Sequence, residues 1–202
     1  MSLFNLAVLT SGSGTNLQAV IDATENGSIP DTQVALVVSN REGVYGLERA
    51  KKHGIVSAVI SGKETDKLFE VLKTHKIDGI VLAGYLSILP LEVVEAFAGK
   101  IINIHPALLP KFGGMGFYGI KVHRAVIEAG DKLSGATAHV VDGGIDTGPI
   151  LVRGVVPVLE SDTAESLQER VLEIEHVVLV KAVKALARGS VEELINKPLT
   201  LK

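Results

Sequence analysis

The sequence predicts an α/β fold: a doubly wound, mainly parallel, twisted sheet, with antiparallel strands added in the C-terminal part and a long C-terminal helix. Three observations predict this fold. Short apolar runs of strand length alternate with segments whose apolar residues recur at helical spacing. Helices of about ten residues between strands imply right-handed crossovers and parallel pairing. From Ser134 onward, strand-like runs follow one another across turns instead.

The first half of the chain contains the predicted parallel strands and the helices between them. Apolar residues recur at helical spacing in Leu17–Ala23, Leu47–His53 and Thr65–His75. Gly54 follows the second of these segments, in the position where a left-handed residue ends a helix. The strands are expected at Phe4–Leu9, Val34–Val38, Ser57–Ile60, Gly79–Ala83 and Ile101–Ile104.

The second half departs from this alternation. Ala136–Val141, Ile150–Val152 and Gly154–Val158 predict two or three antiparallel strands. Asp162, three residues before Glu165, is a capping signal for a long helix whose apolar positions keep a helical period to about Arg188. The last residues of the chain are expected to wrap the surface.

Composition and charge narrow the function classes. The chain has 202 residues, of which 47% are hydrophobic, so we expect one domain with a sizeable core. A formal net charge of −3 argues against binding nucleic acid through many phosphates, and the absence of cysteine excludes disulfides, a thiol nucleophile and cysteine-ligated metals. No apolar run approaches the ~18 residues of a membrane span, and the amino terminus lacks signal-peptide features. A cytoplasmic protein is expected.

The first chemical motif is the glycine loop Ser11–Asn16, between the first strand and the first helix. Backbone N–H groups at a helix start favour an anion, and glycines let a phosphate approach the backbone. An ordinary tight turn with a helix cap is an almost equally good interpretation of such a loop. Leu17 stands where the dinucleotide fingerprint has its third glycine, and the Gly-Lys pair of a P-loop is absent. A monophosphate is therefore favoured over NAD or ATP.

The second motif is Asn103-Ile104-His105-Pro106 at the end of the fifth strand, where open parallel sheets place their ligand crevice. Asn is depleted in strands, and a buried amide without partners is destabilising by about 1–3 kcal/mol. Two residues apart, Asn103 and His105 emerge on the same face and can converge on one atom. Each alone could be a structural polar group, but together an amide and an imidazolium form an oxyanion site.

The third motif is the turn Asp142–Pro149, which holds two acids among three glycines. A segment of this composition is usually an ordinary glycine-rich turn with solvated carboxylates. Beside His105, one of the two carboxylates could orient the imidazole and raise its pKa toward the protonated form. His139 could support this site or simply pack in the core, and the two interpretations have equal weight.

These three motifs resemble the phosphoribosylglycinamide formyltransferase branch of the folate-dependent formyltransferase family, and the resemblance runs along essentially the whole chain. It implies a Rossmann-like formyltransferase fold with residues 1–100 as the phosphate-binding βα half and 101–202 as the catalytic and folate-binding half. It implies transfer of a formyl group from 10-formyltetrahydrofolate to the amine of phosphoribosylglycinamide, in de novo purine biosynthesis. The folate is a cosubstrate, no metal is implied, and the implied partners are small molecules, with a homodimer possible.

The resemblance also implies roles for individual residues. Asn103 and His105 would polarise the formyl oxygen, and Asp146 would keep His105 charged. Glu175 would meet the glycinamide end of the acceptor. The phosphate would bind Gly14, Thr15 and Asn16, and the folate would bind Leu86, Ser87, Ile88, Leu89, Asn103, Asp142, Gly143, Gly144 and Ile145, with Lys63 at its tail.

Two features of the chain depart from that family pattern. Ser87 stands where the family often has arginine, and the glycine-rich segment Lys111–Lys121 is longer than in better-known members. The alternatives are transfer to methionyl-tRNA, hydrolysis of formyltetrahydrofolate, or a non-catalytic phosphosugar-binding module. From a different class, a dinucleotide-binding oxidoreductase would use the glycine loop, with Asn40 and Arg41 near a 2′-phosphate.

Overall fold

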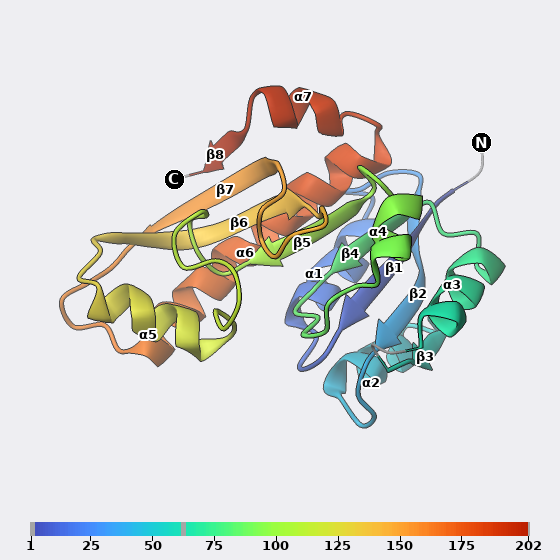
Figure 1. The fold of residues 1–202 in the computed structure, drawn as a ribbon, viewed down its shortest axis with the longest axis horizontal. Helices are drawn as coiled ribbons and strands as arrows, with labels where there is room; N and C mark the ends of the chain where they lie inside the picture. Colours follow the sequence, from blue (N-terminus) through green and yellow to red (C-terminus); the bar gives the residue numbers. More distant parts are fainter. Residues whose placement is uncertain (1–2, 62–63, 202) are drawn as a thin grey trace.

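The structure is a computed structural model that describes residues 3–61 and 64–201. These residues form one eight-stranded sheet with helices on both faces (Figure 1). The strands are β1 (Phe4–Thr10), β2 (Thr32–Ser39), β3 (Ser57–Val59), β4 (Gly79–Leu82), β5 (Ile101–His105), β6 (Leu133–Val140), β7 (Ile150–Pro157) and β8 (Leu199–Leu201). Their order across the sheet is β3-β2-β1-β4-β5-β6-β7-β8.

The pairing of the first five strands explains their continuous apolar runs. β1 pairs in parallel with both β2 and β4, β2 with β3, and β4 with β5. Along β1, Leu6 and Val8 belong to one buried cluster while Ala7 and Leu9 belong to the other. A strand that is covered on both faces needs apolar residues at every position, not only at alternate ones. The predicted doubly wound, mainly parallel fold is confirmed.

The helices divide between the two faces of the sheet. They are α1 (Thr15–Glu25), α2 (Tyr45–Lys52), α3 (Thr65–Thr74), α4 (Leu91–Ala96), α5 (Ile120–Glu128), α6 (Ala164–Ala187) and α7 (Val191–Asn196). Buried residues of α1, α2, α5, α6 and α7 belong to the larger cluster, and those of α3 and α4 belong to the smaller one. The long helix α6 crosses behind the C-terminal strands (Figure 1).

The C-terminal part of the sheet differs from the prediction in two respects. β6 pairs antiparallel with β5 and with β7, whereas β7 pairs in parallel with β8. Only β6 therefore runs against the others among the described strands. The two runs predicted at Ile150–Val152 and Gly154–Val158 form the single strand β7.

Four elements were not predicted: α4, α5, α7 and β8. α4 and α7 have six residues each and β8 has three, too few to display a period. α5 follows a glycine-rich segment that resembles loop sequence. The start of α6 is also one residue later than predicted, because Thr163 and Ser166 form its capping box, while Asp162 accepts a hydrogen bond from the Ser166 hydroxyl.

Within residues 3–61 and 64–201, no helix combines the length and the apolar character that a membrane span requires.

Candidate active site

Two of the predicted motifs and the predicted folate segment Leu86–Leu89 lie at the carboxyl ends of neighbouring strands. Gly14 follows β1, Leu86 follows β4, and His105 is the last residue of β5, and these three strands are neighbours. The carboxyl ends of neighbouring parallel strands frame the ligand crevice in open α/β sheets. The topology therefore places the glycine loop, the Leu86–Leu89 segment and the Asn103–His105 pair together at the carboxyl ends of three neighbouring strands, β1, β4 and β5 (Figure 1).

The glycine loop turns at Gly14, which is the N-cap of α1 and has a φ of 69°. Within the described residues, no side chain caps this helix, so the N–H groups of Thr15 and Asn16 are not covered by a capping group. Arg49 adds a cation to the loop, since its Nε donates to the Ser13 carbonyl at 2.9 Å. Backbone N–H groups, a helix dipole and a guanidinium together suit a phosphate.

Two glycines of this loop have different roles. An ideal Cβ at Gly14 would lie 2.7 Å from the Gly46 Cα and 3.3 Å from the Arg49 Cδ, whereas one at Gly12 would meet nothing within 4 Å. Gly14 is therefore required for the close packing of α1 against α2, in addition to any contact with a ligand. Gly12 leaves open space above the loop.

Glu175, in α6, is a buried carboxyl that faces the start of α1. Its Oε2 accepts a hydrogen bond from Asn16 Nδ2 at 2.7 Å, and the residue is 8% exposed. Burial raises the pKa of Glu175 to about 7, and the hydrogen bond from Asn16 opposes this rise. The Asn16 Oδ1 is buried too and has no partner among the described residues. A carboxyl that ionises near pH 7 and an open amide oxygen both suit an amine.

Asn103 and His105 both contact the carboxylate of Asp146. Asn103 Nδ2 donates to Asp146 Oδ1 at 3.2 Å, and His105 Nδ1 lies 3.4 Å from Asp146 Oδ2. The same Oδ2 accepts the N–H of Gly114 at 3.0 Å. The shared face that the spacing predicts is therefore present. In this structure, however, the two side chains converge on the carboxylate and not on an open position.

His139 belongs to the same cluster rather than to the plain core. Its Nδ1 lies 2.9 Å from the Val140 carbonyl oxygen and its Nε2 lies 3.0 Å from Asn103 Nδ2. A carbonyl oxygen only accepts, so Nδ1 carries the proton and Nε2 accepts from the Asn103 amide. The register supports this contact, because Asn103 pairs directly with His139 between β5 and β6. His139 thus fixes the orientation of the Asn103 amide.

Opposing effects act on the pKa of His105. Burial lowers the pKa of His105, and this effect exceeds the opposing effects of the Asp146 carboxylate and the Phe112 carbonyl. Asp146 therefore raises this pKa, as expected, but the net shift is downward because burial has the larger effect. Burial raises the pKa of Asp146, but the neighbouring His139 and His105 rings and the Gly114 N–H outweigh burial, so the pKa of that carboxyl is lowered. The pKa of Asp146 and the pKa of His105 are thus both lowered, the first by hydrogen bonds and neighbouring groups and the second by burial.

The loop after His105 folds back over its own strand and is held by β6 and β7. Thr137 Oγ1 donates to the Ala107 carbonyl at 2.6 Å and accepts the N–H of Leu109 at 3.1 Å. Arg153 Nη2 donates to the Leu109 carbonyl at 2.8 Å. His105, Thr137 and Arg153 are directly paired across the three strands, so their side chains share one face. The same loop brings the Phe112 carbonyl oxygen to 2.7 Å from His105 Nε2.

The turn after β6 separates its two acids. Asp142 Oδ1 accepts from the Gly144 N–H at 2.9 Å and from the Thr147 hydroxyl at 2.6 Å, so this carboxylate organises the turn itself. The hydrogen bond from Thr147 is the main reason that the pKa of Asp142 is lowered. Asp146 points instead to His105, as described above. Of the two acids, only Asp146 contacts the histidine among the described interactions.

The predicted folate segments lie near one another. An ideal Cβ at Gly143 would lie 3.8 Å from the Leu91 Cδ1, so the turn after β6 approaches the segment that follows β4. In that segment Leu86 and Ile88 are 49% and 68% exposed, whereas Leu89 is buried. Ile145 is also exposed. Exposed aliphatic side chains on two facing segments suit a flat ring system, and Lys63 lies outside the described residues.

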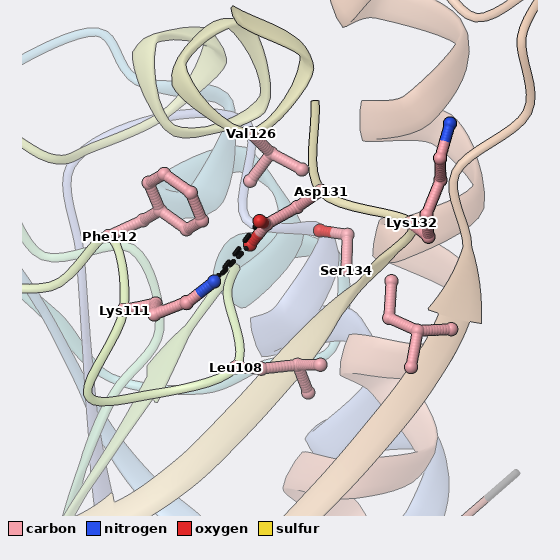
Figure 2. Close-up of a pocket in the computed structure, with 8 residues that line it drawn as sticks. Leu108, Lys111, Phe112, Val126, Asp131, Lys132 and Ser134 are labelled. Carbon is pink, nitrogen blue, oxygen red and sulfur yellow. Dashed lines mark hydrogen bonds and ion pairs between the residues drawn. The ribbon is translucent and has the colours of Figure 1, made fainter. Parts of the chain in front are cut away.

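A pocket of about 320 Å³ is lined in part by Leu108, Lys111 and Phe112 of the loop that follows His105 (Figure 2). Its lining includes the Phe112 side chain and the ion pair of Lys111 with Asp131, in which Nζ lies 2.8 Å from Oδ2. None of the candidate catalytic side chains lines this pocket. The site is therefore defined by the converging polar groups and not by this hollow.

Sequence reasoning missed several polar groups of the site: Arg49, Phe112, Thr137 and Arg153. The contribution of Phe112 is a backbone carbonyl, which no residue type reveals. Thr137 and Arg153 reach the loop only because β6 and β7 pair with β5. Among the described residues, no group of three or more His, Asp or Glu side chains could hold a metal ion, and the expectation that none is needed stays a prediction.

Comparison with known sequences gives consistent matches. A family model described as Formyl transferase matches residues 4–183, which include Gly14, His105, Asp146 and Glu175. The chain is 42% identical over 195 residues to the chloroplastic phosphoribosylglycinamide formyltransferase of Arabidopsis thaliana, a match that covers 93% of this chain and 66% of that protein. It is 40% identical over 191 residues to the phosphoribosylglycinamide formyltransferase of Haemophilus influenzae, covering 91% and 87%.

Comparison with solved structures agrees with these sequence matches. The crystal structure of glycinamide ribonucleotide transformylase 1 from Symbiobacterium toebii matches with a TM-score of 0.86 and 39% identity, covering 93% of this chain and 89% of that one. This chain thus spans most of the bacterial proteins that it matches, but just under two thirds of the Arabidopsis protein.

Proposed function

Because the chain belongs to the formyl transferase family, we propose that it transfers the formyl group of 10-formyltetrahydrofolate to the primary amine of phosphoribosylglycinamide in purine biosynthesis. The observation that carries this proposal is the arrangement of the edge formed by β1, β4 and β5. There a phosphate-type loop at Gly14 lies on the same edge as the cluster of Asn103, His105 and Asp146. The glycine loop suits a phosphorylated acceptor, and the cluster of Asn103, His105 and Asp146 suits an acyl donor.

Glu175 is proposed to hold the attacking amine. A carboxyl with a pKa of about 7 is ionised in part at neutral pH and can accept a proton from an ammonium group. The amine must be neutral to attack, so this proton transfer prepares the nucleophile. Asn16 is the last residue of the glycine loop and donates to Glu175. This contact links the group proposed for the phosphate end of the acceptor to the group proposed for its amine end.

The reaction follows from the chemistry of acyl transfer. The nitrogen lone pair attacks the formyl carbon on N10, a C–N bond forms, and the carbonyl electron pair becomes an oxyanion. N–H groups of Asn103 and His105 are proposed to donate to that oxyanion. The attacking nitrogen loses a proton, N10 gains one, and the C–N10 bond breaks. The products are the N-formyl ribonucleotide and tetrahydrofolate.

Asp146 is proposed to stabilise His105 when the imidazole becomes charged. Burial lowers the pKa of His105 in the free protein, so the imidazolium needs the nearby carboxylate to persist. His105 Nε2 faces the Phe112 carbonyl at 2.7 Å, and this hydrogen bond must be exchanged before Nε2 can donate to a substrate. Gly113 and Gly114 follow Phe112, which favours such a backbone rearrangement.

The folate is proposed to bind between the Leu86–Leu89 segment and the turn that carries Asp142, Gly143, Gly144 and Ile145. The approach of Gly143 to Leu91 and the exposure of Leu86 and Ile88 support this assignment. We propose small molecules as the only partners of the reaction, and the net charge of −3 agrees with this. The cytoplasmic location and the homodimer remain predictions.

A coupled absorbance assay tests the proposed function. The chain is mixed with 10-formyltetrahydrofolate and, in separate reactions, with phosphoribosylglycinamide, with methionyl-tRNA, or with no acceptor. We expect formation of the folate product only with phosphoribosylglycinamide. Equal turnover without an acceptor would indicate hydrolysis, and turnover with methionyl-tRNA alone would indicate the other transferase; either result would overturn the proposal.

A further inference from the structure

A chain of hydrogen bonds joins the glycine loop to the candidate folate segment. Ser11, the residue before Gly12, is 4% exposed. Its hydroxyl accepts the N–H of Leu86 at 2.8 Å and donates to Asn40 Oδ1 at 2.6 Å. Its own N–H donates to the Gly84 carbonyl at 3.1 Å. One serine therefore holds both the start of the glycine loop and the turn after β4.

Asn40 completes the connection. This residue follows β2 directly, and its Nδ2 donates to the Ser87 hydroxyl at 2.7 Å. The orientation of the amide follows from its neighbours: the Leu86 N–H already donates to Ser11, so the Ser11 proton is directed to an acceptor on Asn40. Ser87 also forms a side-chain hydrogen bond with Tyr85. Asn40 thus bridges a residue of each segment with opposite ends of one amide.

The two bridged segments are the ones that ligands would order. The glycine loop is open at Gly12, where a Cβ would meet nothing within 4 Å. In the other segment, Leu86 and Ile88 are largely exposed on either side of Ser87. Exposed segments of few apolar contacts lie at the low-stability end of a protein and gain order when a ligand binds.

We infer that Asn40 is a positioning residue that couples the two substrate subsites, so that binding of the phosphorylated acceptor raises the affinity for the folate and the reverse. This inference rests on the proposed function. The hydrogen bonds are short and directional, so Ser11 and Ser87 cannot change position independently while Asn40 joins them. The first ligand therefore orders both segments, and the second ligand binds to a segment whose ordering entropy has already been lost.

The inference explains two sequence features together. Asn40 has no direct place in the formyl-transfer chemistry, and a dinucleotide 2′-phosphate is the only role that the sequence alone indicates for it. The hydroxyl of Ser87 is the acceptor that completes the bridge. In this chain the position contributes to a connection between the two subsites.

Isothermal titration calorimetry measures the coupling directly. The affinity for phosphoribosylglycinamide is determined with and without saturating tetrahydrofolate, which carries no formyl group and cannot react. We expect the folate to tighten ribonucleotide binding in the wild type by a factor of about 5 or more, within the usual range of such couplings. In Asn40→Ala we expect each ligand to bind alone, with a coupling factor clearly smaller than that of the wild type, because only the direct hydrogen bonds of Ser11 with Leu86 and Gly84 then join the segments.

Ser39→Ala is the matched control. Ser39 precedes Asn40 and its hydroxyl donates to the Arg41 carbonyl at 2.9 Å, so this variant disturbs the same loop without interrupting the bridge. It should keep the coupling of the wild type. Ser87→Ala, which removes the acceptor of Asn40 Nδ2, should reduce the coupling as Asn40→Ala does.

Hydrogen exchange gives a second readout that does not depend on activity. Ribonucleotide alone should slow exchange of the Leu86 amide, which donates to Ser11, and the slowing should be weaker in Asn40→Ala than in the wild type. If both ligands bind the wild type with a coupling factor of 1, or if Asn40→Ala keeps the full coupling, the inference is wrong while the proposed function stands. If the wild type binds neither ligand, the proposed function itself fails.

Discussion

The carboxyl of Glu175 makes the stability of the protein depend on pH in a way that one substitution removes. Glu175 is buried against Asn16, and burial raises its pKa from the ordinary 4.5 to about 7. The unfolded chain loses this proton near pH 4.5, whereas the folded chain retains it to about pH 7. Between these values the unfolded state binds fewer protons than the folded state, so the free energy of unfolding falls as pH rises.

The size of the effect follows from the two pKa values. The interval from 4.5 to about 7, at about 1.4 kcal/mol for each pH unit, corresponds to a loss of about 3 kcal/mol on going from pH 4.5 to pH 7.5. Glu175→Gln has no carboxyl to ionise, so its stability should lack this contribution. The variant should therefore gain about 3 kcal/mol relative to the wild type across that pH range.

Urea unfolding at pH 4.5, 6.0 and 7.5 measures the difference between the two proteins at each pH. Glu173→Gln is the control, because Glu173 is exposed on the same helix two residues away. Its difference from the wild type should stay constant with pH. The argument is refuted if the difference for Glu175→Gln is also constant, or if the variant loses stability relative to the wild type as pH rises.

Three further predictions concern the surrounding groups. Asp146→Asn should lower the pKa of His105 further, because the carboxylate that opposes the effect of burial is removed. Asp142→Asn should leave the pKa of His105 nearly unchanged. NMR titration of the imidazole distinguishes the two variants, and the reverse pattern would identify Asp142 as the partner of His105. Arg153→Met should release the Leu109 carbonyl, lower the free energy of unfolding by about 1.5–3 kcal/mol and reduce kcat more than either KM; unchanged unfolding and kinetics would contradict this. Gly14→Ala should lower Tm, since its Cβ would lie 2.7 Å from the Gly46 Cα. Gly12→Ala should fold normally and raise KM for the ribonucleotide more than KM for the folate. Equal losses of Tm in the two variants would refute the distinction.

Much of the fold is encoded in local pattern. The strands β1, β2, β4 and β5 are continuous apolar runs because both of their faces are covered, and α6 keeps its helical period over many turns. The elements that were missed lack such a signal. α4 has only six residues, and β8 is a short edge strand whose position depends on pairing with β7.

The site was predictable where its residues are close in sequence. The two-residue spacing of Asn103 and His105 fixes their shared face whatever the rest of the chain does. The partnership of His105 with Asp146 required the resemblance to a known family, since the turn contains two acids. The bridge through Asn40 and the contact of Arg153 with Leu109 depend on strand order and register, which sequence spacing does not reveal.

The direction of the His105 pKa could not be predicted for a related reason. The sequence identifies a carboxylate that raises this pKa, but it does not give the burial of the imidazole. In the structure His105 is 4% exposed, and burial has the larger effect. Burial therefore opposes the positive charge on His105, and the Asp146 carboxylate favours it.

Transfer of a labelled formyl group tests the central claim most directly. The chain is incubated with 10-formyltetrahydrofolate labelled with ¹³C in the formyl group and with phosphoribosylglycinamide, and the label is followed by NMR in the wild type, Asn103→Ala and His105→Ala, each shown to be folded by its Tm. The account predicts that the wild type moves the label to the glycinamide nitrogen and that each variant does so roughly a hundredfold more slowly. Release of the label as formate by the wild type, or a normal rate of transfer in either folded variant, would contradict it.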